Sequence, residues 1–241
     1  MIITGLNAVS EALESEMTVE KIYIRKDSVM TSKKAVDFIS KARKKGIRII
    51  FEERSKLDVL FPNERDQRII AETTEFKYID FDELLSKPGE NKLYVILSGI
   101  EDPHNLGAIL RVCESVGVTG VIIPERRAVG VNDTVMRASA GAATHVPTAK
   151  VTNINNAIRT LKDNFVNVYS ADSKGESVYS LKLSGDIAVV IGSEGNGVPE
   201  LAKKLSDKII SLPQRGKVNS LNASVATGII LYEIARQRLE F

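Results

Sequence analysis

Short apolar runs that alternate with amphipathic stretches constrain the fold of this chain more than any other feature. Residues 93–97 are apolar at every position, which is typical of a strand buried on both faces of a parallel sheet. Similar runs follow at 120–123, 166–169, 187–191 and 209–212. Helical patterns separate them, at 106–116, 153–161, 199–205 and 221–239. The alternation predicts an α/β fold in which helices cover a parallel sheet.

The amino-terminal third predicts a smaller α/β unit of its own. Its spacing predicts strands at 21–25, 48–51 and 68–72, and helices at 33–45 and 55–60. Gly46 is expected to end the longer helix. The chain then becomes polar and turn-rich as far as Pro88-Gly89. We therefore expect a small domain over 1–76, a linker over 77–91 and a second domain over 92–241.

Composition excludes several classes of protein. The 241 residues are 43% hydrophobic and 27% charged, unlike a disordered chain, a collagen or a coiled-coil rod. The sequence has neither an apolar run long enough to span a membrane nor a signal-peptide pattern at its amino terminus. Cys113 and two histidines cannot form a disulfide framework or a Cys/His zinc site. We therefore expect a cytoplasmic protein without a membrane partner or a metal.

Basic residues concentrate in the amino-terminal unit, although the net charge of the whole chain is only +2. Between Lys21 and Arg48 there are ten Lys or Arg and two Asp, a local excess of eight positive charges. Such a cluster on one face would attract a polyanion such as RNA. The alternative is a solvated helix face with no partner.

The loop after the run at 93–97 is the first of three that could carry chemistry, because ligands of parallel sheets bind at the carboxyl ends of the strands. Pro103 and Asn105 are expected to form a turn and a helix cap. Arg111 follows six residues later, and its guanidinium could face a phosphate or a developing oxyanion, or form a structural ion pair. His104 lies close to Asp102, but without a Gly-x-Ser-x-Gly motif a catalytic triad is not indicated.

The second loop, 191–199, is rich in glycine. Gly192, Gly195 and Gly197 follow the order G-x-x-G-x-G, which is neither a dinucleotide-binding nor a Walker fingerprint. The alternative is a simple tight turn. Glu194 within the loop could accept hydrogen bonds from backbone N–H groups and so hold bare backbone towards a ligand.

The third loop, from residue 212 onwards, is polar and basic and leads into a helix that Ser220 or Asn222 could cap. Small residues at the start of this helix would let another backbone approach closely. The alternative is a capped terminal helix with a close-packed seam and no ligand.

Together the three loops resemble the signature motifs of the SpoU family of RNA 2′-O-ribose methyltransferases, in the SPOUT superfamily. The motifs are N-x-G-x-x-x-R, here Asn105, Gly107 and Arg111; G-x-E-G-x-G, here Gly192, Glu194, Gly195 and Gly197; and I-P-M-x-G-x-x-x-S-L-N-x-S, here Leu212, Pro213, Gly216, Ser220, Leu221, Asn222 and Ser224. The resemblance covers residues 92–241. The basic amino-terminal unit resembles the family's ribosomal-protein-like RNA-binding domain. The two-domain layout is most similar to the branch that methylates a guanosine ribose of bacterial 23S rRNA.

The resemblance implies a fold, a cofactor and an assembly. The fold is a parallel sheet tied in a trefoil knot, which pattern alone would not predict. The cofactor is S-adenosylmethionine, contacted by backbone groups of Gly192, Leu212 and Leu221. The assembly is a homodimer, with the carboxy-terminal helices and the first motif at its interface.

The resemblance also implies catalytic roles. Arg111 is the family's catalytic arginine, and because a guanidinium stays protonated we expect it to stabilise the developing 2′-oxyanion rather than act as a base. Asn105, Ser220 and Asn222 would position the ribose or Arg111, and Glu194 would brace its loop. One departure is Gln214, which stands where the motif has Met, so we expect different packing against the adenine.

Two other functions remain open. An inactive RNA-binding or assembly factor is opposed by the intact set of motif residues. A methyltransferase acting on a guanosine of the tRNA D-loop is a second possibility, although the basic amino-terminal unit favours a larger RNA. A small-molecule methyltransferase would leave that unit unexplained.

Overall fold

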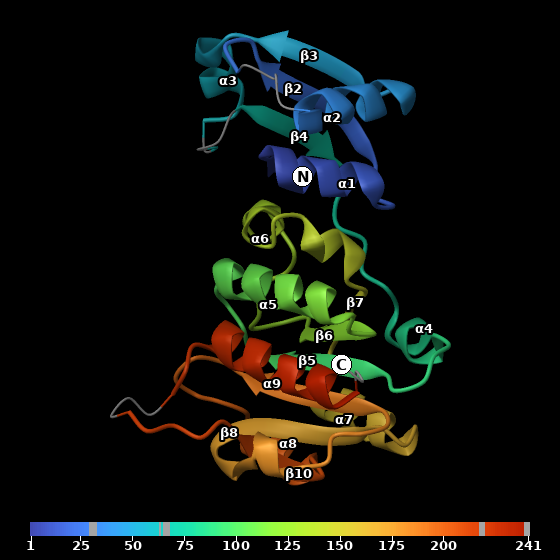
Figure 1. The fold of residues 1–241 in the computed structure, drawn as a ribbon, viewed down its shortest axis with the longest axis vertical. Helices are drawn as coiled ribbons and strands as arrows, with labels where there is room; N and C mark the ends of the chain where they lie inside the picture. The colour runs from blue at the N-terminus through green and yellow to red at the C-terminus, as the bar shows by residue number, and fades with distance from the viewer. Residues whose placement is uncertain (29–32, 63, 65–67, 217–219, 239–241) are drawn as a thin grey trace. The chain divides into compact units, whose positions relative to one another are not determined.

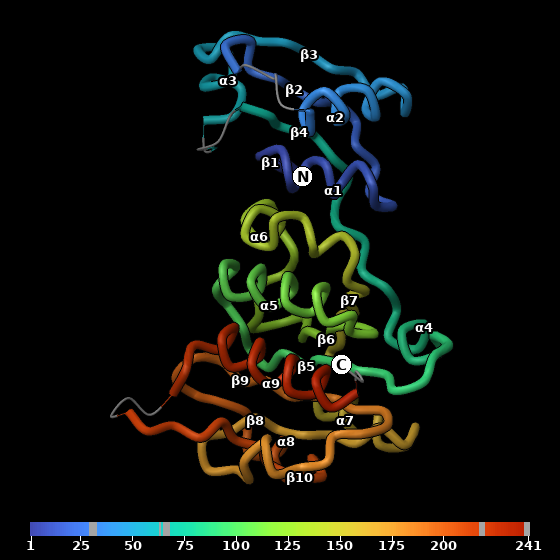
Figure 2. Tube along the Cα trace, viewed as in Figure 1, coloured from blue at the N-terminus to red at the C-terminus, as the bar shows by residue number. Residues whose placement is uncertain are grey.

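The computed structural model describes residues 1–28, 33–62, 64, 68–216 and 220–238. The chain forms two compact units: Met1–Lys77 with Val131–His145, and Tyr78–Gly130 with Val146–Phe241. Figures 1 and 2 trace the chain through both. The α/β fold with a smaller amino-terminal part and a parallel carboxy-terminal sheet is therefore confirmed.

The first unit is built on a four-stranded sheet in the order β1-β4-β2-β3. Its elements are β1 (Ile2–Thr4), α1 (Leu6–Glu14), β2 (Val19–Arg25), α2 (Lys33–Lys44), β3 (Arg48–Glu52), α3 (Arg54–Leu60) and β4 (Ile69–Thr73). Strands β2 and β3 are parallel, and β4 runs antiparallel to both β1 and β2. The rings of Tyr23 and Phe61 meet edge to face with centroids 5.1 Å apart, in a cluster with Leu57 and Ile70.

Five elements of this unit match the sequence predictions, whereas β1 and α1 were not predicted. Gly46 does end α2: its φ is +71°, and the N–H of Ile47 donates to the carbonyl of Ala42. Strand β1 is only three residues long, too short for its periodicity to be recognised. In α1 the buried residues Ala8, Val9, Ala12 and Leu13 have helical spacing, so the sequence does carry a signal for this helix.

A segment from the middle of the chain also belongs to the first unit. It contains α6 (Asp133–Ala138) and a 3₁₀ helix (Ala142–His145). The N–H of Ile2 donates to Asp133 Oδ1 over 3.0 Å, and Arg137 pairs with Glu64 over 2.6 Å. Burial raises the pKa of Asp133. Because these contacts join residues far apart in sequence, no local pattern indicated them.

The second unit is built on a six-stranded sheet in the order β10-β8-β9-β5-β6-β7, with every neighbouring pair parallel. The strands are β5 (Leu93–Ser98), β6 (Gly120–Pro124), β7 (Thr148–Val151), β8 (Asn167–Ser177), β9 (Ile187–Gly192) and β10 (Lys208–Ser211). The helices are α4 (Phe81–Ser86), α5 (Pro103–Val116), α7 (Ile154–Asp163), α8 (Glu200–Leu205) and α9 (Ala223–Arg238), with a short 3₁₀ helix at Val178–Ser180. The predicted end of the last helix at Leu239 lies outside the described residues.

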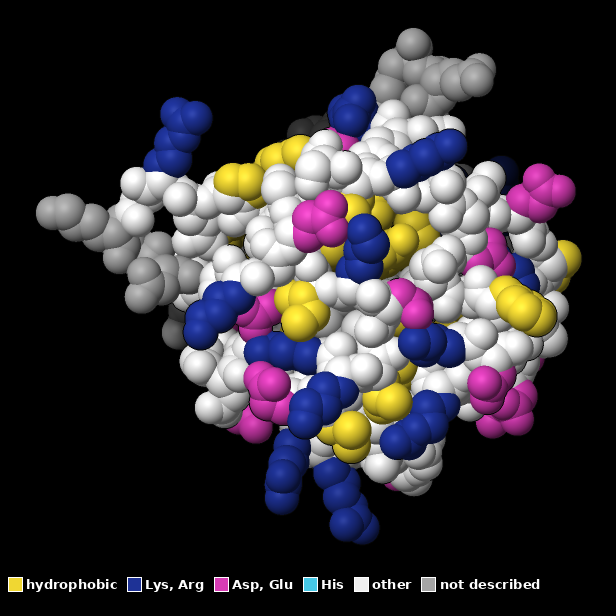
Figure 3. All heavy atoms as spheres, turned by 90° about the horizontal axis from the view of Figure 1, so that it is seen from below, with side chains coloured by type: hydrophobic (Ala, Val, Ile, Leu, Met, Phe, Trp, Pro, Cys, Tyr) yellow, Lys and Arg dark blue, Asp and Glu magenta, His cyan; other side chains and the backbone are white. Residues whose placement is uncertain are grey.

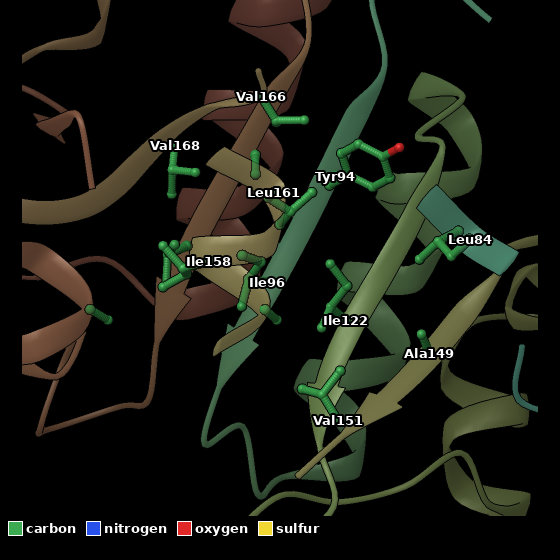
Figure 4. Packing of buried hydrophobic residues seen from close by; sticks show 14 of the residues in the cluster. Leu84, Tyr94, Ile96, Ile122, Ala149, Val151, Ile158, Leu161, Val166 and Val168 are labelled. Atoms are coloured by element: carbon green, nitrogen blue, oxygen red, sulfur yellow. The ribbon is translucent and has the colours of Figure 1, made fainter. Parts of the chain in front are cut away.

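Helices cover the two faces of this sheet. On one face, Ile158 and Leu161 of α7 point towards Ile96 of β5 (Figure 4), in a buried cluster that also includes residues of α4 and α8. Helices α5 and α9 pack against each other, and a Cβ added at Gly228 would lie 3.7 Å from Val112. The five strands predicted here are confirmed. Strand β7 was missed because Thr148-Ala149-Lys150-Val151 is short and interrupted by a charge.

The stretch expected to be a linker contains α4, capped by Asp80, whose side chain accepts from the N–H groups of Asp82 and Glu83. Leu84 of this helix is fully buried, and a Cβ at Gly120 would lie 2.4 Å from its Cδ1. Leu84 is the one buried residue in the polar stretch 75–91, so composition alone did not indicate a helix here. The boundaries 1–76, 77–91 and 92–241 stay a prediction about independently folding domains.

Candidate functional site

The loops that follow β5, β9 and β10 carry the three predicted motifs. Strands β5 and β9 are neighbours with Ser98 opposite Gly192, so the first two loops start side by side. The third loop leads into α9, which packs on α5. Parallel strands end at the same edge of a sheet, and that edge is where ligands of such folds bind.

One polar network joins all three loops. Glu194 Oε1 accepts hydrogen bonds from Asn105 Nδ2 over 3.1 Å and from Asn222 Nδ2 over 2.7 Å. Asn222 Nδ2 also lies 2.9 Å from Asn105 Oδ1. Because a carboxylate only accepts, both amides must turn their nitrogens towards Glu194, and the three side chains have a single consistent arrangement. Asn105 is 8% exposed, so its amide depends on this network.

Two expectations about these loops need correction. Glu194 accepts from side-chain amides of other loops rather than from backbone N–H groups, so it ties three loops together instead of bracing its own. Asn105 does not cap α5: Asp102 is the cap, with its Oδ1 2.9 Å from the N–H of His104. Pro103 takes the first helical position, where its missing N–H costs nothing, and this moves the helix start towards the strand.

Asn222 rather than Ser220 caps α9, because its Oδ1 accepts from the N–H of Ser224 over 2.9 Å. The same side chain thus caps the helix with its oxygen and holds Glu194 with its nitrogen. Through Asn222 the direction of α9 and the position of the glycine loop are coupled.

The glycine loop folds back on itself after β9. Ser193 and Gly197 form an isolated antiparallel bridge, and Gly195 and Gly197 have φ values of +88° and +64°. A Cβ at Gly192 would lie 2.0 Å from the carbonyl carbon of Gly197. Glycine is therefore required at 192 by the loop's own fold, a reason different from the expected approach of a ligand.

A cavity of about 660 Å³ opens beside this loop. Its lining brings together residues from β8, the glycine loop, the third loop and α9: Ala171, Asp172, Ser173, Lys174, Ile191, Gly192, Ser193, Glu194, Gly195, Asn196, Gly197, Ile210, Ser211, Leu212, Gln214, Ser220, Leu221, Asn222, Ala223, Ala226 and Ile230. The three predicted cofactor contacts, Gly192, Leu212 and Leu221, thus share one cavity. The volume falls in the range of roughly 300–1,000 Å³ usual for small-molecule sites.

Arg111 stands apart from this cavity. It is exposed on α5, and its guanidinium forms no hydrogen bond or ion pair with the residues that the structure describes. Six residues of helix separate it from Asn105 by about 9 Å along the axis and roughly 240° of rotation, so the two side chains lie on different faces. Within one chain, Arg111 is therefore not brought to the network.

The sequence did not indicate the wall formed by β8. The strand was expected at 166–169 but continues to Ser177, and its distal half lines the cavity. Asp172 pairs there with Lys203 over 2.6 Å, which lowers the pKa of Asp172 and raises that of Lys203. The one available signal was Gly175, where a Cβ would lie 2.6 Å from the backbone of Ile209.

In the described part of the chain, histidine, cysteine, aspartate and glutamate side chains form no group of three or more that could hold a metal ion. No helix among the described residues is long and apolar enough to cross a membrane.

Comparison with known proteins gives two family matches. Residues 92–232 match the SpoU rRNA methylase family, and residues 2–79 match the RNA 2′-O ribose methyltransferase substrate-binding domain. Bacillus subtilis YacO, assigned to the TrmH family of tRNA/rRNA methyltransferases, is 38% identical over 98% of this chain and 95% of its own.

Solved structures agree with these matches. The SpoU methyltransferase AviRb from Streptomyces viridochromogenes, crystallised with AdoMet, superposes with a TM-score of 0.81 at 25% identity, over 99% of this chain and 90% of that one. The TrmH/SpoU tRNA-modifying enzyme of A. aeolicus, at 30% identity, gives a TM-score of 0.56 over 66% of this chain and 80% of its own. With both family models matching in order and relatives aligned over nearly the whole length, the chain belongs to the SpoU family of RNA methyltransferases.

Proposed function

We propose that this protein transfers a methyl group from S-adenosylmethionine to the ribose 2′-hydroxyl of a guanosine in 23S rRNA. The observation that carries the proposal is the network of Asn105, Glu194 and Asn222, one residue from each of three distant loops, at the border of the 660 Å³ cavity. A structural role alone would not require three polar side chains beside a cavity open to solvent.

The cavity fits the proposed cofactor. Its lining combines the apolar side chains of Ile191, Ile210 and Ile230 with the backbone of a glycine-rich loop. The polar rim suits the amino acid moiety of the cofactor. Gly192, Leu212 and Leu221 would hold the cofactor, and Gln214 would lie near it in place of the usual apolar side chain.

The protein's own task is to orient the hydroxyl and to manage its charge, because the cofactor, when bound, supplies an electrophilic methyl group. Asn222 and Ser220, both at the cavity, would position the ribose. Arg111 would stabilise the negative charge that develops on the 2′-oxygen as its proton leaves. Asn105 would hold Glu194 in place.

Arg111 can act only if another molecule brings it to the cavity, since it lies on a different face of α5 from Asn105. A second copy of this chain would do so. Exposed apolar side chains on α9 support a homodimer packed through this region: Val225 is 50% exposed and Tyr232 is 57% exposed. Arg111 would then complete the site of the partner.

A large RNA is favoured by the first unit. Helix α2 buries Ala35, Phe38 and Ala42 and turns its lysines and Arg43 to solvent. Four of the ten cations between 21 and 48 form ion pairs, Lys21, Arg25, Lys26 and Lys41, which leaves the others for a polyanion. The second candidate, a tRNA D-loop guanosine, keeps support from YacO's assignment to a family of tRNA/rRNA methyltransferases.

Mapping ribose methylation tests the proposal. In a bacterial strain that lacks this protein, we expect 23S rRNA to lose one 2′-O-methyl group, restored by the wild-type gene. Loss of a mark from tRNA alone would make the second candidate correct. No change in any RNA, together with no binding of S-adenosylmethionine by calorimetry, would favour the inactive assembly factor. The trefoil knot and the cytoplasmic location stay predictions of the same family resemblance.

A further inference from the structure

A second cavity, of about 860 Å³, lies on the other side of the glycine loop. It is formed where β5, β6, β7 and β9 end, and its lining lies entirely within the second unit. Ser193, Glu194, Asn196 and Gly197 line both cavities. The glycine loop therefore borders both cavities, and Glu194 and its amide partners lie at the common border.

The loop after β6 gives this cavity its cations. Arg126 and Arg127 both line it, both are exposed, and neither guanidinium forms a hydrogen bond or ion pair with the described residues. The lining contains three acidic residues. Asp102 caps α5, Glu194 accepts hydrogen bonds in the network, and Glu101 is the third. Two unpaired guanidinium groups at one rim suit phosphate, which they can bind with paired hydrogen bonds.

Several cations elsewhere on the second unit are paired with acids. On the face that carries α8 and β10, basic and acidic side chains are interspersed (Figure 3). Lys162 pairs with Asp207 over 2.8 Å and Lys208 with Glu176 over 3.1 Å. The two arginines at the second cavity differ from these paired cations in having no acid partner among the described residues.

The position of the two arginines is built into the fold. The N–H of Val129 donates to the carbonyl of Ile100 over 2.9 Å, which ties the arginine loop to the first motif loop. Gly99 has a φ of +81°, and a Cβ there would lie 3.6 Å from both the Arg127 carbonyl oxygen and Ser193. Arg127 has a φ of +57°, an uncommon conformation for a residue other than glycine. Three loops thus meet around Gly99 and hold the arginines beside the glycine loop.

We propose that the second cavity receives the target nucleotide, with Arg126 and Arg127 binding the backbone phosphates that flank its ribose. The inference rests on the proposed function, because a methyl acceptor must reach the cofactor cavity from a neighbouring site. The ribose of a nucleotide held here would reach the border that the two cavities share, next to the Asn105–Glu194–Asn222 network and to Ser220 of the cofactor cavity. Phosphate contacts set the register of an RNA chain, so the arginines select which ribose is presented.

The test compares Arg126→Ala/Arg127→Ala with Arg159→Ala, a single exposed arginine of α7 outside both cavities. The substrate is the RNA that accepts tritiated methyl groups from the wild-type protein, a 23S rRNA transcript or a tRNA pool. For the double variant we expect kcat/KM for RNA to fall at least tenfold, mainly through KM, with unchanged affinity for S-adenosylmethionine. The slope of log K for RNA against log salt should shrink by about 1.4, or roughly 0.7 for each lost contact to single-stranded phosphate. Arg159→Ala should change neither quantity.

An unchanged kcat/KM and an unchanged salt slope in the double variant would overturn the inference while the proposed function stands. If the wild-type protein methylates no RNA at all, the proposed function itself fails. If the double variant has a lowered melting temperature, Thr152→Trp is tested in its place. Residue 152 lines the second cavity but not the first, so the larger side chain should fill the second cavity alone. Full activity of that variant on RNA would equally overturn the inference, and loss of activity with intact cofactor binding would support it.

Discussion

At the scale of single residues, Glu194 carries more of the site than any neighbour, because it is the common acceptor for amides from two other loops. Asn105, largely buried, has its nitrogen satisfied through that carboxylate. A hydrogen bond to a charged group contributes about 1.5–3 kcal/mol, and an unsatisfied buried amide costs about 1–3 kcal/mol. The exposed position of Glu194 puts its contribution at the lower end.

Two substitutions at Glu194 separate its charge from its role as an acceptor. Glu194→Gln keeps an oxygen for both amides, so we expect its affinity for S-adenosylmethionine to fall less than threefold. Glu194→Ala leaves the Asn105 amide unpaired and frees the loop, and we expect at least a tenfold loss, about 1.4 kcal/mol. Calorimetric titration measures both. Equal losses in the two variants would indicate that charge, not bracing, is what the cofactor needs.

Substitution of Arg111 should separate the rate of methyl transfer from cofactor affinity. Because it lies outside the lining of the cofactor cavity, Arg111→Ala should leave cofactor affinity unchanged. Its methyl-transfer rate should fall by about 10²–10³, the cost of removing one donor to a developing oxyanion. Single-turnover assays with saturating RNA measure the rate, with Arg159→Ala as the control. Lost cofactor binding with a normal rate in the bound complex would contradict the assigned role.

At the scale of elements, α9 combines a cap at its start with an ion pair near its end in which the carboxylate is buried and the guanidinium is exposed. Glu233 is 7% exposed and accepts from Arg236 over 2.8 Å and from Gln237 over 2.7 Å. The Arg236 guanidinium lowers the pKa of Glu233 from 4.5 to about 2, partly opposed by burial. A lowered pKa in the folded state stabilises the fold above the unfolded pKa, and the stabilisation disappears as the pH falls through the folded pKa.

Glu233→Gln should therefore lower the melting temperature at pH 7 by roughly 2–4 °C, as expected for about 1 kcal/mol in a chain of this size. The difference from wild type should shrink as the pH falls from about 4.5 towards 2. Differential scanning calorimetry at pH 7 and pH 3 makes the comparison. A difference that stays constant over this range would mean that packing, rather than charge, explains the effect.

Helix α4 lies in a polar stretch that was expected to be a linker. Its anchor Leu84 packs on Gly120, which has no side chain to compete for the space. We expect Leu84→Ala to destabilise the second unit by about 2–5 kcal/mol, as other buried leucines do. Leu201→Ala on α8, where the side chain is 48% exposed, is the control and should cost less than about 0.5 kcal/mol. Equal effects in urea unfolding would mean that α4 is not part of the core.

At the scale of the whole molecule, the separation of Arg111 from the network predicts that two chains share each site. Arg111→Ala alone should be nearly inactive, and Glu194→Ala alone should be at least tenfold less active when S-adenosylmethionine is below its dissociation constant. Mixed dimers of the two would contain one complete site, from the Arg111 of one chain and the Glu194 of the other. Equimolar mixing and refolding should then restore roughly a quarter of the wild-type activity, because half of the dimers are mixed and each has one working site. Dimers that exchange subunits without recovering activity would mean that each site forms within one chain.

The fold class was predictable because its signals are local. Residues 93–97, unbroken and apolar, predict a central parallel strand, and β5 is buried at all six positions. The turn at Gly46 likewise depends on neighbouring residues alone. Strand β1, with three residues, and strand β7, whose four residues include a charge, carry too little periodicity to be recognised.

The sequence by itself determined the sheet of parallel strands, the three motif loops and the family, because strand burial and glycine-dependent turns are encoded by residues next to one another. Only the tertiary structure decided that Glu194 binds side chains of two other loops, that Arg111 lies outside the lining of the cofactor cavity, that residues 131–145 pack in the first unit and that two arginines border a second cavity. These features depend on which distant segments meet in space. Long-range packing determines which segments meet, and no pattern of neighbouring residues encodes that packing.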